Sequence, residues 1–121
     1  AKLPPLVNIV FMGMGEPLNN LEQVRIAVEQ LVHPKAFAFS RRAVCVSTVG
    51  PSPSLISKAA RVLPSRLAWS VHAADDGLRR QLVPTTRHTM EQLRDTFQAA
   101  LALKPARVRG LVVELALIAV C

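Results

Sequence analysis

The side chains of this chain that could do chemistry stand where short apolar runs end. The first is Glu16, which lies between Gly15 and Pro17 soon after the run at residues 9–12. A run of about four to eight apolar residues bounded by turn residues is typical of a strand buried on both faces. Glycine lets the backbone turn sharply and lets a ligand come close, whereas proline ends the strand. A carboxylate placed there can accept hydrogen bonds from a cationic group of a ligand.

The glycines of this loop do not match the nucleotide-binding fingerprints. Leu18 stands where the G-x-G-x-x-G pattern requires its third glycine, and no Lys-Ser or Lys-Thr pair follows to make a P-loop. Spacing alone therefore leaves three interpretations open. The loop is an ordinary tight turn between a strand and a helix, a ligand loop built around Glu16, or the loop of an unrelated phosphate-binding β/α domain.

Two later apolar runs also end in polar side chains. Ser47 falls at the end of the run at residues 43–48, and Ser70 and His72 fall at the end of the run at residues 67–72. Because alternate residues of a strand share a face, we expect Ser70 and His72 to point the same way, which would place a hydroxyl beside an imidazole. The spacing by itself fits a buried serine and an internally bonded histidine more simply.

Helical patterns separate these runs. Apolar residues recur at helical spacing over residues 21–31, 55–63 and 93–101, and a fourth apolar run, predicted as a strand, covers 111–120. Strand and helix alternate, which predicts an α/β fold with about four parallel strands joined by crossover helices. The carboxyl ends of parallel strands meet at one edge of a sheet, so we expect Glu16, Ser47 and Ser70 to converge there.

Composition limits the class of protein. The chain has 121 residues, enough for one domain, and half of them are hydrophobic, which is typical of a globular rather than a disordered segment. The formal net charge of +7 favours an acidic partner such as RNA, without locating a site. Neither Cys45 nor Cys121 has a CxxC partner, so we expect no metal site and no disulfide framework. The longest apolar run is too short to span a bilayer, and we expect no membrane partner.

Several strings resemble one family in particular. Residues 10–20, VFMGMGEPLNN, are similar to the radical-SAM RNA adenine methyltransferases of the RlmN/Cfr family. Three further blocks match in order, RAVCVSTVG at 42–50, LAWSVHA at 67–73 and LRRQLVP at 78–84. The likeness runs from about residue 8 to residue 90 and fades after Lys104.

The resemblance implies a partial (β/α) radical-SAM barrel that binds S-adenosylmethionine, together with a 4Fe–4S cluster held by a CxxxCxxC loop. It implies methylation of adenine at C2 in 23S rRNA, and of tRNA in some members. The glycine and glutamate of the first loop would hold the methionine amino end, and the serines and histidine the rest of the cofactor. The cofactor-binding residues it implies are Gly15, Glu16, Ser47, Ser70, Val71 and His72.

The chain also departs from the family pattern. It contains no CxxxCxxC motif, so the resemblance implies cluster cysteines upstream of residue 1, and it assigns no catalytic or metal-binding residue within the chain. We therefore expect residues 1–121 to be a fragment of a single radical-SAM core domain, inactive when isolated, whether as part of a full enzyme or as a truncated isoform. We expect RNA as its partner without an obligate protein partner, in the cytoplasm or an organelle. The alternative is a non-catalytic RNA-binding or interaction fragment of the same fold.

Overall fold

The computed structural model describes residues 2–115, and strands and helices alternate through them. The strands are β1 (Ile9–Phe11), β2 (Val44–Thr48), β3 (Arg66–Ser70) and β4 (Leu111–Glu114). The helices are α1 (Leu21–Val32), α2 (Pro53–Val62), α3 (Asp76–Leu82) and α4 (Met90–Ala102). Short 3₁₀ turns at Pro17–Asn20 (η1), Arg41–Ala43 (η2) and Ala106–Val108 (η3) complete the path. The predicted α/β fold with four parallel strands is confirmed.

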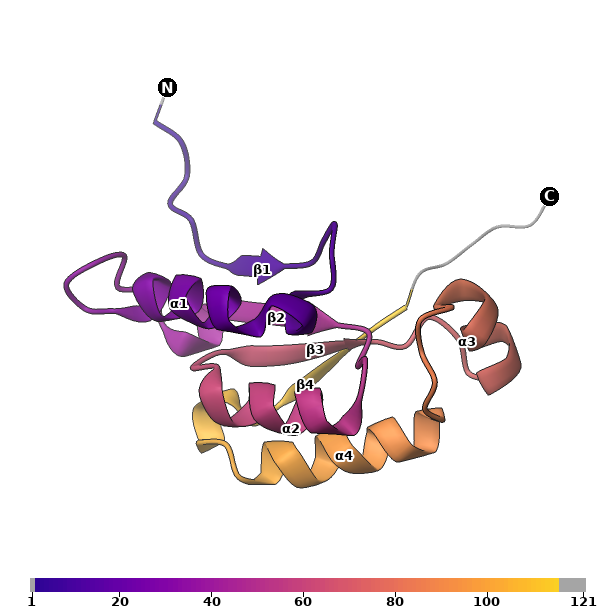
Figure 1. Ribbon diagram of the computed structural model, residues 1–121. Coiled ribbons are helices and arrows are strands. Elements are labelled where there is room, and N and C mark those ends of the chain that lie inside the picture. Colours follow the sequence, from indigo (N-terminus) through magenta and orange to yellow (C-terminus); the bar gives the residue numbers. More distant parts are fainter. Residues whose placement is uncertain (1, 116–121) are drawn as a thin grey trace.

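The four strands form one parallel sheet in the order β1-β2-β3-β4, which is also their order in the chain. Helices α1, α2 and α4 lie on one side of this sheet, and α3 is set beyond the end of β3 (Figure 1). A sheet that adds each new strand on the same side, with its helices on one face, is the geometry of a β/α barrel wall. A doubly wound sheet instead reverses its strand order and carries helices on both faces.

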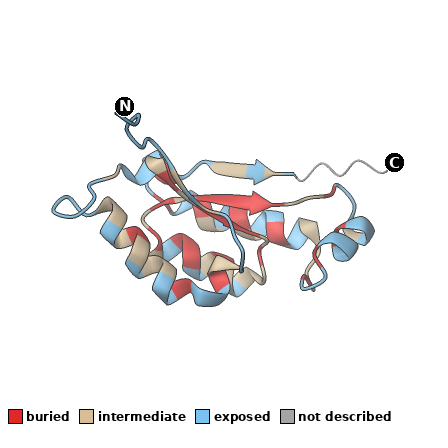
Figure 2. Ribbon diagram, turned by 90° about the horizontal axis from the view of Figure 1, so that it is seen from above, coloured by how far each residue is buried: buried red, intermediate tan, exposed pale blue. Residues whose placement is uncertain are grey.

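The hydrophobic core lies between the sheet and these helices. Val46, Leu67 and Trp69 from the two central strands pack against Ile56 of α2 and Phe97 of α4. The Trp69 and Phe97 rings lie with centroids 5.3 Å apart, within the range of a favourable aromatic pair. Buried residues accordingly gather on β2, β3 and the inward faces of the helices (Figure 2).

The expectation that the first strand is buried on both faces is wrong. Val10, at the centre of β1, is 45% exposed, and Met12 just beyond it is 67% exposed. Within the described residues β1 is an edge strand, and helices cover only one face of the sheet. An apolar run shows that a strand prefers burial, but the position of the strand in the sheet decides how much of that burial it obtains.

Two helices start where a side chain can reach the free backbone N–H groups. Ser52 accepts from Leu55 N at 3.2 Å at the start of α2, and Thr89 and Gln92 form a capping box at the start of α4. Asn20 occupies the cap position of α1 without a side-chain hydrogen bond, because the 3₁₀ turn η1 leads directly into that helix. The predicted fourth strand at 111–120 begins correctly, and its part from residue 116 lies outside the described residues.

Candidate cofactor-binding edge of the sheet

Glu16 ties the loop after β1 to the end of β2. One carboxylate oxygen, Oε1, accepts from Leu18 N at 3.0 Å and from Thr48 Oγ1 at 2.5 Å, and the other, Oε2, accepts from Val49 N at 3.0 Å. The first of these bonds caps η1. The other two fix the loop that leads from β2 to α2. A carboxylate has about four acceptor positions, so three internal bonds leave Glu16 little capacity for a ligand.

These bonds argue against the phosphate-binding interpretation of the glycine loop. A phosphate loop needs backbone N–H groups that point at the ligand. Here the N–H groups of Leu18 and Val49 already donate to Glu16, and the carboxylate would repel a phosphate placed beside it.

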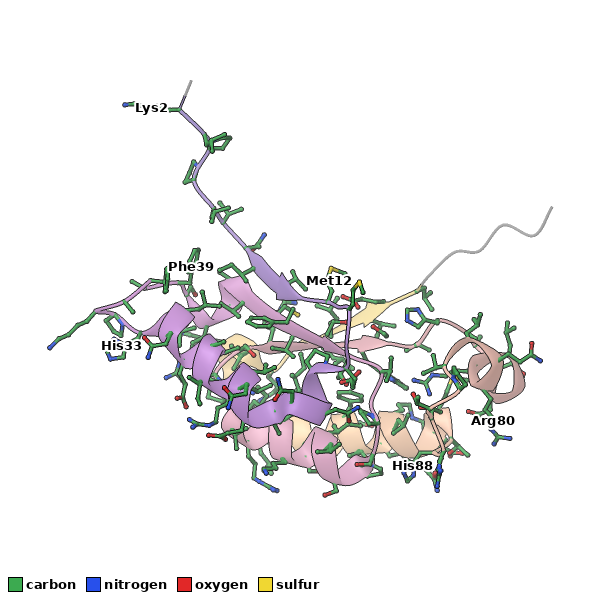
Figure 3. All side chains as sticks on the ribbon, turned by 45° about the horizontal axis from the view of Figure 1, so that its top comes forward. Lys2, Met12, His33, Phe39, Arg80 and His88 are labelled. Carbon is green, nitrogen blue, oxygen red and sulfur yellow. The ribbon has the colours of Figure 1, made fainter. Side chains whose placement is uncertain are left out.

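The glycines before Glu16 leave the loop open on its outer side. A Cβ placed on Gly13 or Gly15 would meet no heavy atom within 4 Å. A shallow cleft of about 260 Å³ lies beside this loop, lined by Phe11, Gly13, Gly15, Glu16, Pro17, Asn20 and Val24. Met12 lies at the turn where the chain leaves β1 (Figure 3). Backbone carbonyls and N–H groups at the glycines are therefore accessible to a ligand in a way that a side chain would prevent.

Ser47 and Ser70 converge on a third residue that the sequence analysis did not assign to the site. The two hydroxyl oxygens lie 3.0 Å apart, across the pairing of β2 with β3. Ser70 Oγ donates to Glu114 Oε2 at 2.9 Å, and Ser47 Oγ donates to the same oxygen. Both serines alternate with core residues and so lie on the sheet face away from the helices, 5% and 8% exposed. The predicted convergence of strand ends is observed for these two residues, with Glu114 added.

Glu114 also holds the segment that follows Ser70. Its backbone carbonyl accepts from Val71 N at 3.0 Å and from His72 N at 3.4 Å. The pairing of β3 with β4 places Glu114 opposite Ser70, so side chain and main chain act on adjacent parts of β3. A single acidic residue inside the apolar run 111–120 was the sequence signal that could have revealed it, because a charge in a strand facing a sheet surface needs partners.

The expectation that Ser70 and His72 share a strand face is wrong. Strand β3 ends at Ser70, and His72 has a φ of +65°, so the two-residue alternation of a strand does not extend to it. The backbone hydrogen bonds to Glu114 turn the chain at this point instead. His72 still lies two residues beyond the serine cluster in the chain, at the carboxyl end of β3.

Arg79 is a second residue whose role the sequence did not reveal. Its side chain is completely buried, and it donates to Val49 O at 2.7 Å, to Val71 O at 3.0 Å and to Thr86 Oγ1 at 3.1 Å. A further contact reaches Ser70 O at 3.4 Å. No carboxylate among the described residues pairs with it, and burial lowers the pKa of its guanidinium. Arg79 thus joins the end of β2 to the end of β3 from beneath the site.

The opposite end of the sheet carries a different feature, the buried Lys104. Its ammonium group donates to the carbonyls of Ala60 at 3.0 Å and Leu63 at 2.7 Å, at the C-terminus of α2. A cation is favourable there because the helix dipole is negative at that end. Burial, with a smaller contribution from Arg41, lowers the pKa of Lys104 to about 8. A hollow of about 500 Å³ lies beside it, at the edge remote from Glu16 and Ser47.

Comparison with known proteins identifies the relatives of this segment. No protein-family profile matches the chain. The probable dual-specificity RNA methyltransferase RlmN of Bifidobacterium adolescentis is 40% identical over 88% of this chain. The corresponding protein of Mycobacterium tuberculosis is 52% identical over 65% of it. A crystal structure of a radical SAM methyltransferase from Sphaerobacter thermophilus superimposes with a TM-score of 0.78 and 32% identity over 93% of this chain.

The chain is homologous to part of the RlmN RNA methyltransferases. It spans only 30% of the Bifidobacterium relative and 22% of the Mycobacterium relative, and 32% of the Sphaerobacter chain. The radical-SAM fold expected from the sequence is confirmed by the superposition. Most of the length of these relatives therefore lies outside this segment.

The residues of this segment do not fit an iron–sulfur cluster. Among residues 2–115, no group of three or more His, Cys, Asp or Glu side chains is arranged to hold a metal ion. Cys45 is the cysteine within that range, and burial raises the pKa of its thiol, opposed by Arg66 and reinforced by Glu114. A neutral thiol is a poor metal ligand. The same range contains no helix with the length and apolar character needed to cross a bilayer.

Proposed function

We propose that this segment binds S-adenosylmethionine in a radical-SAM RNA methyltransferase that methylates adenine at C2 in 23S rRNA, and in tRNA. The observation that carries the proposal is the convergence of polar side chains at the carboxyl ends of β2, β3 and β4, in a chain homologous to RlmN enzymes. Ligand sites of β/α folds lie at that edge. The cytoplasm or an organelle is the compartment we infer, because ribosomal and transfer RNA are found there.

The residues present fit the cofactor in their chemistry. The cleft beside the glycines offers backbone carbonyl oxygens and the carboxylate of Glu16, which can accept hydrogen bonds from an ammonium group. We infer that Gly15 and Glu16 hold the methionine amino end. The remaining cofactor contacts that we propose are Ser47, Ser70, Val71 and His72. Bound S-adenosylmethionine would supply the methyl group and the radical chemistry.

Glu16 is proposed to act mainly by shaping the site. Its three internal hydrogen bonds hold the glycine loop against the end of β2, so the loop is already in place when a ligand arrives. A preformed loop lowers the entropic cost of binding. Residues 2–115 contribute no cluster ligand, and the proposed part of the segment in the reaction is to bind and orient the cofactor.

The proposed activity can be tested on the complete gene product that contains this chain. The protein, reconstituted anaerobically with iron and sulfide, is incubated with S-adenosylmethionine, a reductant and either 23S rRNA or tRNA, and the nucleosides are then separated by mass spectrometry. We expect 2-methyladenosine from rRNA and from tRNA. A product methylated elsewhere, or RNA binding without methylation at any adenine, would contradict the proposal and favour a non-catalytic RNA-binding role.

Cofactor binding is tested separately with the variant Glu16→Gln. We expect the affinity for S-adenosylmethionine to fall roughly 10-fold, because the amide cannot accept from all three internal donors and also receive an ammonium group. Glu22→Gln, a change of the same type on the exposed side of α1, is the matched control. Equal affinities for the two variants would show that Glu16 is not part of the binding edge.

A further inference from the structure

Glu114 dictates which hydrogen-bonding partners the two serines can accept. A serine hydroxyl carries a single proton and two acceptor lone pairs. Ser47 and Ser70 lie within hydrogen-bond distance of Glu114 Oε2 and of each other, so both protons are used inside the group, on the carboxylate or on the other serine. Each hydroxyl can then act toward a ligand only as an acceptor. The carboxylate itself can only accept, and no described residue donates to its second oxygen, Oε1.

This edge of the sheet is therefore an acceptor cluster, made of Ser47, Ser70 and Glu114. A ligand group that binds there has to donate hydrogen bonds. Hydroxyl groups and ammonium groups do so, whereas a carboxylate or a phosphate would bring acceptor against acceptor and charge against like charge. The cluster also has the geometry for two donors at once, because the two serine oxygens lie 3.0 Å apart.

We propose that Glu114 is a specificity and positioning residue that prepares Ser47 and Ser70 to receive the two ribose hydroxyls of the cofactor. This inference rests on the proposed function and adds a residue and a direction of hydrogen bonding to it. The other donors of S-adenosylmethionine are its ammonium group and the amino group of its adenine. The loop at Gly15 and Glu16, which follows a different strand, is the proposed place of the ammonium group, and the deoxy analogues described below separate the ribose from the adenine. The cofactor's carboxylate is excluded from the acceptor cluster.

Glu114 also fixes the neighbouring backbone, which links specificity to position. Its carbonyl accepts from Val71 N and His72 N, while its side chain accepts from Ser47 and Ser70. Four of the six residues proposed to contact the cofactor are thus held by this one residue. Substituting the carboxylate changes the hydrogen-bonding direction of the serines without removing the main-chain bonds.

The test measures binding of two probes to the complete gene product by calorimetry. S-adenosylmethionine carries ribose, adenine, amino and carboxylate groups, whereas 5′-methylthioadenosine keeps the ribose and the adenine and lacks the amino and carboxylate groups. In Glu114→Gln we expect both probes to weaken by a similar factor, roughly 10-fold, because the amide NH2 group can donate to a serine and turn that hydroxyl's proton toward the ribose. Glu91→Gln, on the exposed surface of α4 with a side chain 78% exposed, is the control and should bind both probes unchanged.

Analogues of the wild-type ligand provide a second measurement that does not depend on a variant folding. The 2′-deoxy and 3′-deoxy forms of 5′-methylthioadenosine should bind roughly 10-fold more weakly than the parent compound. Ser70→Ala, which retains the carboxylate, should abolish most of that difference.

Three results would overturn the inference. Weakening of S-adenosylmethionine alone in Glu114→Gln would place the ammonium group at the cluster. Tighter binding of S-adenosylmethionine to that variant would place the cofactor's carboxylate at the cluster. Equal affinity of the wild type for parent and deoxy compounds would remove the ribose from the cluster. A folded wild type that binds neither probe would instead refute the proposed function itself.

Discussion

Arg79 offers the most direct test of how the two central strand ends are held. Its guanidinium is buried without a carboxylate and donates to the backbone carbonyls of Val49, Ser70 and Val71. These carbonyls lie at the ends of β2 and β3, next to the residues proposed to bind the cofactor. Replacing Arg79 with methionine keeps the volume of the side chain roughly constant and removes every donor at once.

The expected cost follows from counting these bonds. A hydrogen bond from a charged donor contributes about 1.5–3 kcal/mol, and a buried acceptor left unsatisfied costs about 1–3 kcal/mol. Against this loss, the variant no longer has to bury a guanidinium, which is itself unfavourable, as the lowered pKa of Arg79 reflects. The balance predicts a loss of about 3 kcal/mol in the free energy of unfolding.

Thermal unfolding followed by circular dichroism on the complete gene product is the appropriate assay. In a protein of the relatives' length, of which this chain spans 30% or less, a loss of this size corresponds to a fall in Tm of about 4 °C. Arg80→Met is the matched control, because Arg80 is the next residue of the same helix and projects from its exposed side (Figure 3). We expect the control to change Tm by less than about 1 °C, since exposed substitutions usually cost under 0.5 kcal/mol.

The hydrogen bonds of Arg79 also predict a functional difference between these variants. Arg79→Met should weaken S-adenosylmethionine binding at temperatures where it is still folded, because the ends of β2 and β3 lose their common anchor. If Arg79→Met is as stable as Arg80→Met and binds the cofactor equally well, the buried hydrogen bonds contribute nothing measurable, and the proposed coupling of the two strand ends is incorrect.

Two further predictions concern residues away from the proposed cofactor contacts. Gly50→Ala should lower the free energy of unfolding, measured by urea titration, by about 1–2 kcal/mol, because Gly50 has a φ of +72° and an added Cβ would lie 3.2 Å from Ile56 Cδ1. Gly110→Ala, where an added Cβ would meet no heavy atom within 4 Å, should be nearly neutral in the same titration. The pKa of Lys104 is lowered to about 8 in the folded state from 10.5, so the unfolded chain binds this proton more strongly, and stability gains a contribution as pH rises from about 8 to 10.5. Between pH 7 and pH 10.5, Tm should therefore rise more in the wild type than in Lys104→Met. Lys58→Met, on the exposed side of α2, is the control and should follow the wild type. The same change of Tm in all three proteins would show that Lys104 titrates normally.

The sequence by itself determined which elements form and their order along the chain. Helical spacing, the capping residues Ser52 and Thr89 and the turn residues around Gly15 act over a few positions, so they can be recognised from neighbouring residues alone. The alternation of strands and helices then restricted the topology to parallel pairing, and with it the convergence of Ser47 and Ser70.

Only the tertiary structure decided how these ends are joined. The bond between Ser47 and Glu114 links residues 67 positions apart, and it depends on the register of β4 against β3. The acceptors of Arg79 come from two strand ends and a loop, and no local pattern identifies them. The exposure of Val10 depends on which strands stand beside β1. Local propensities act between near neighbours, whereas hydrogen-bond partners and burial are set by chain segments that meet only when the sheet has formed.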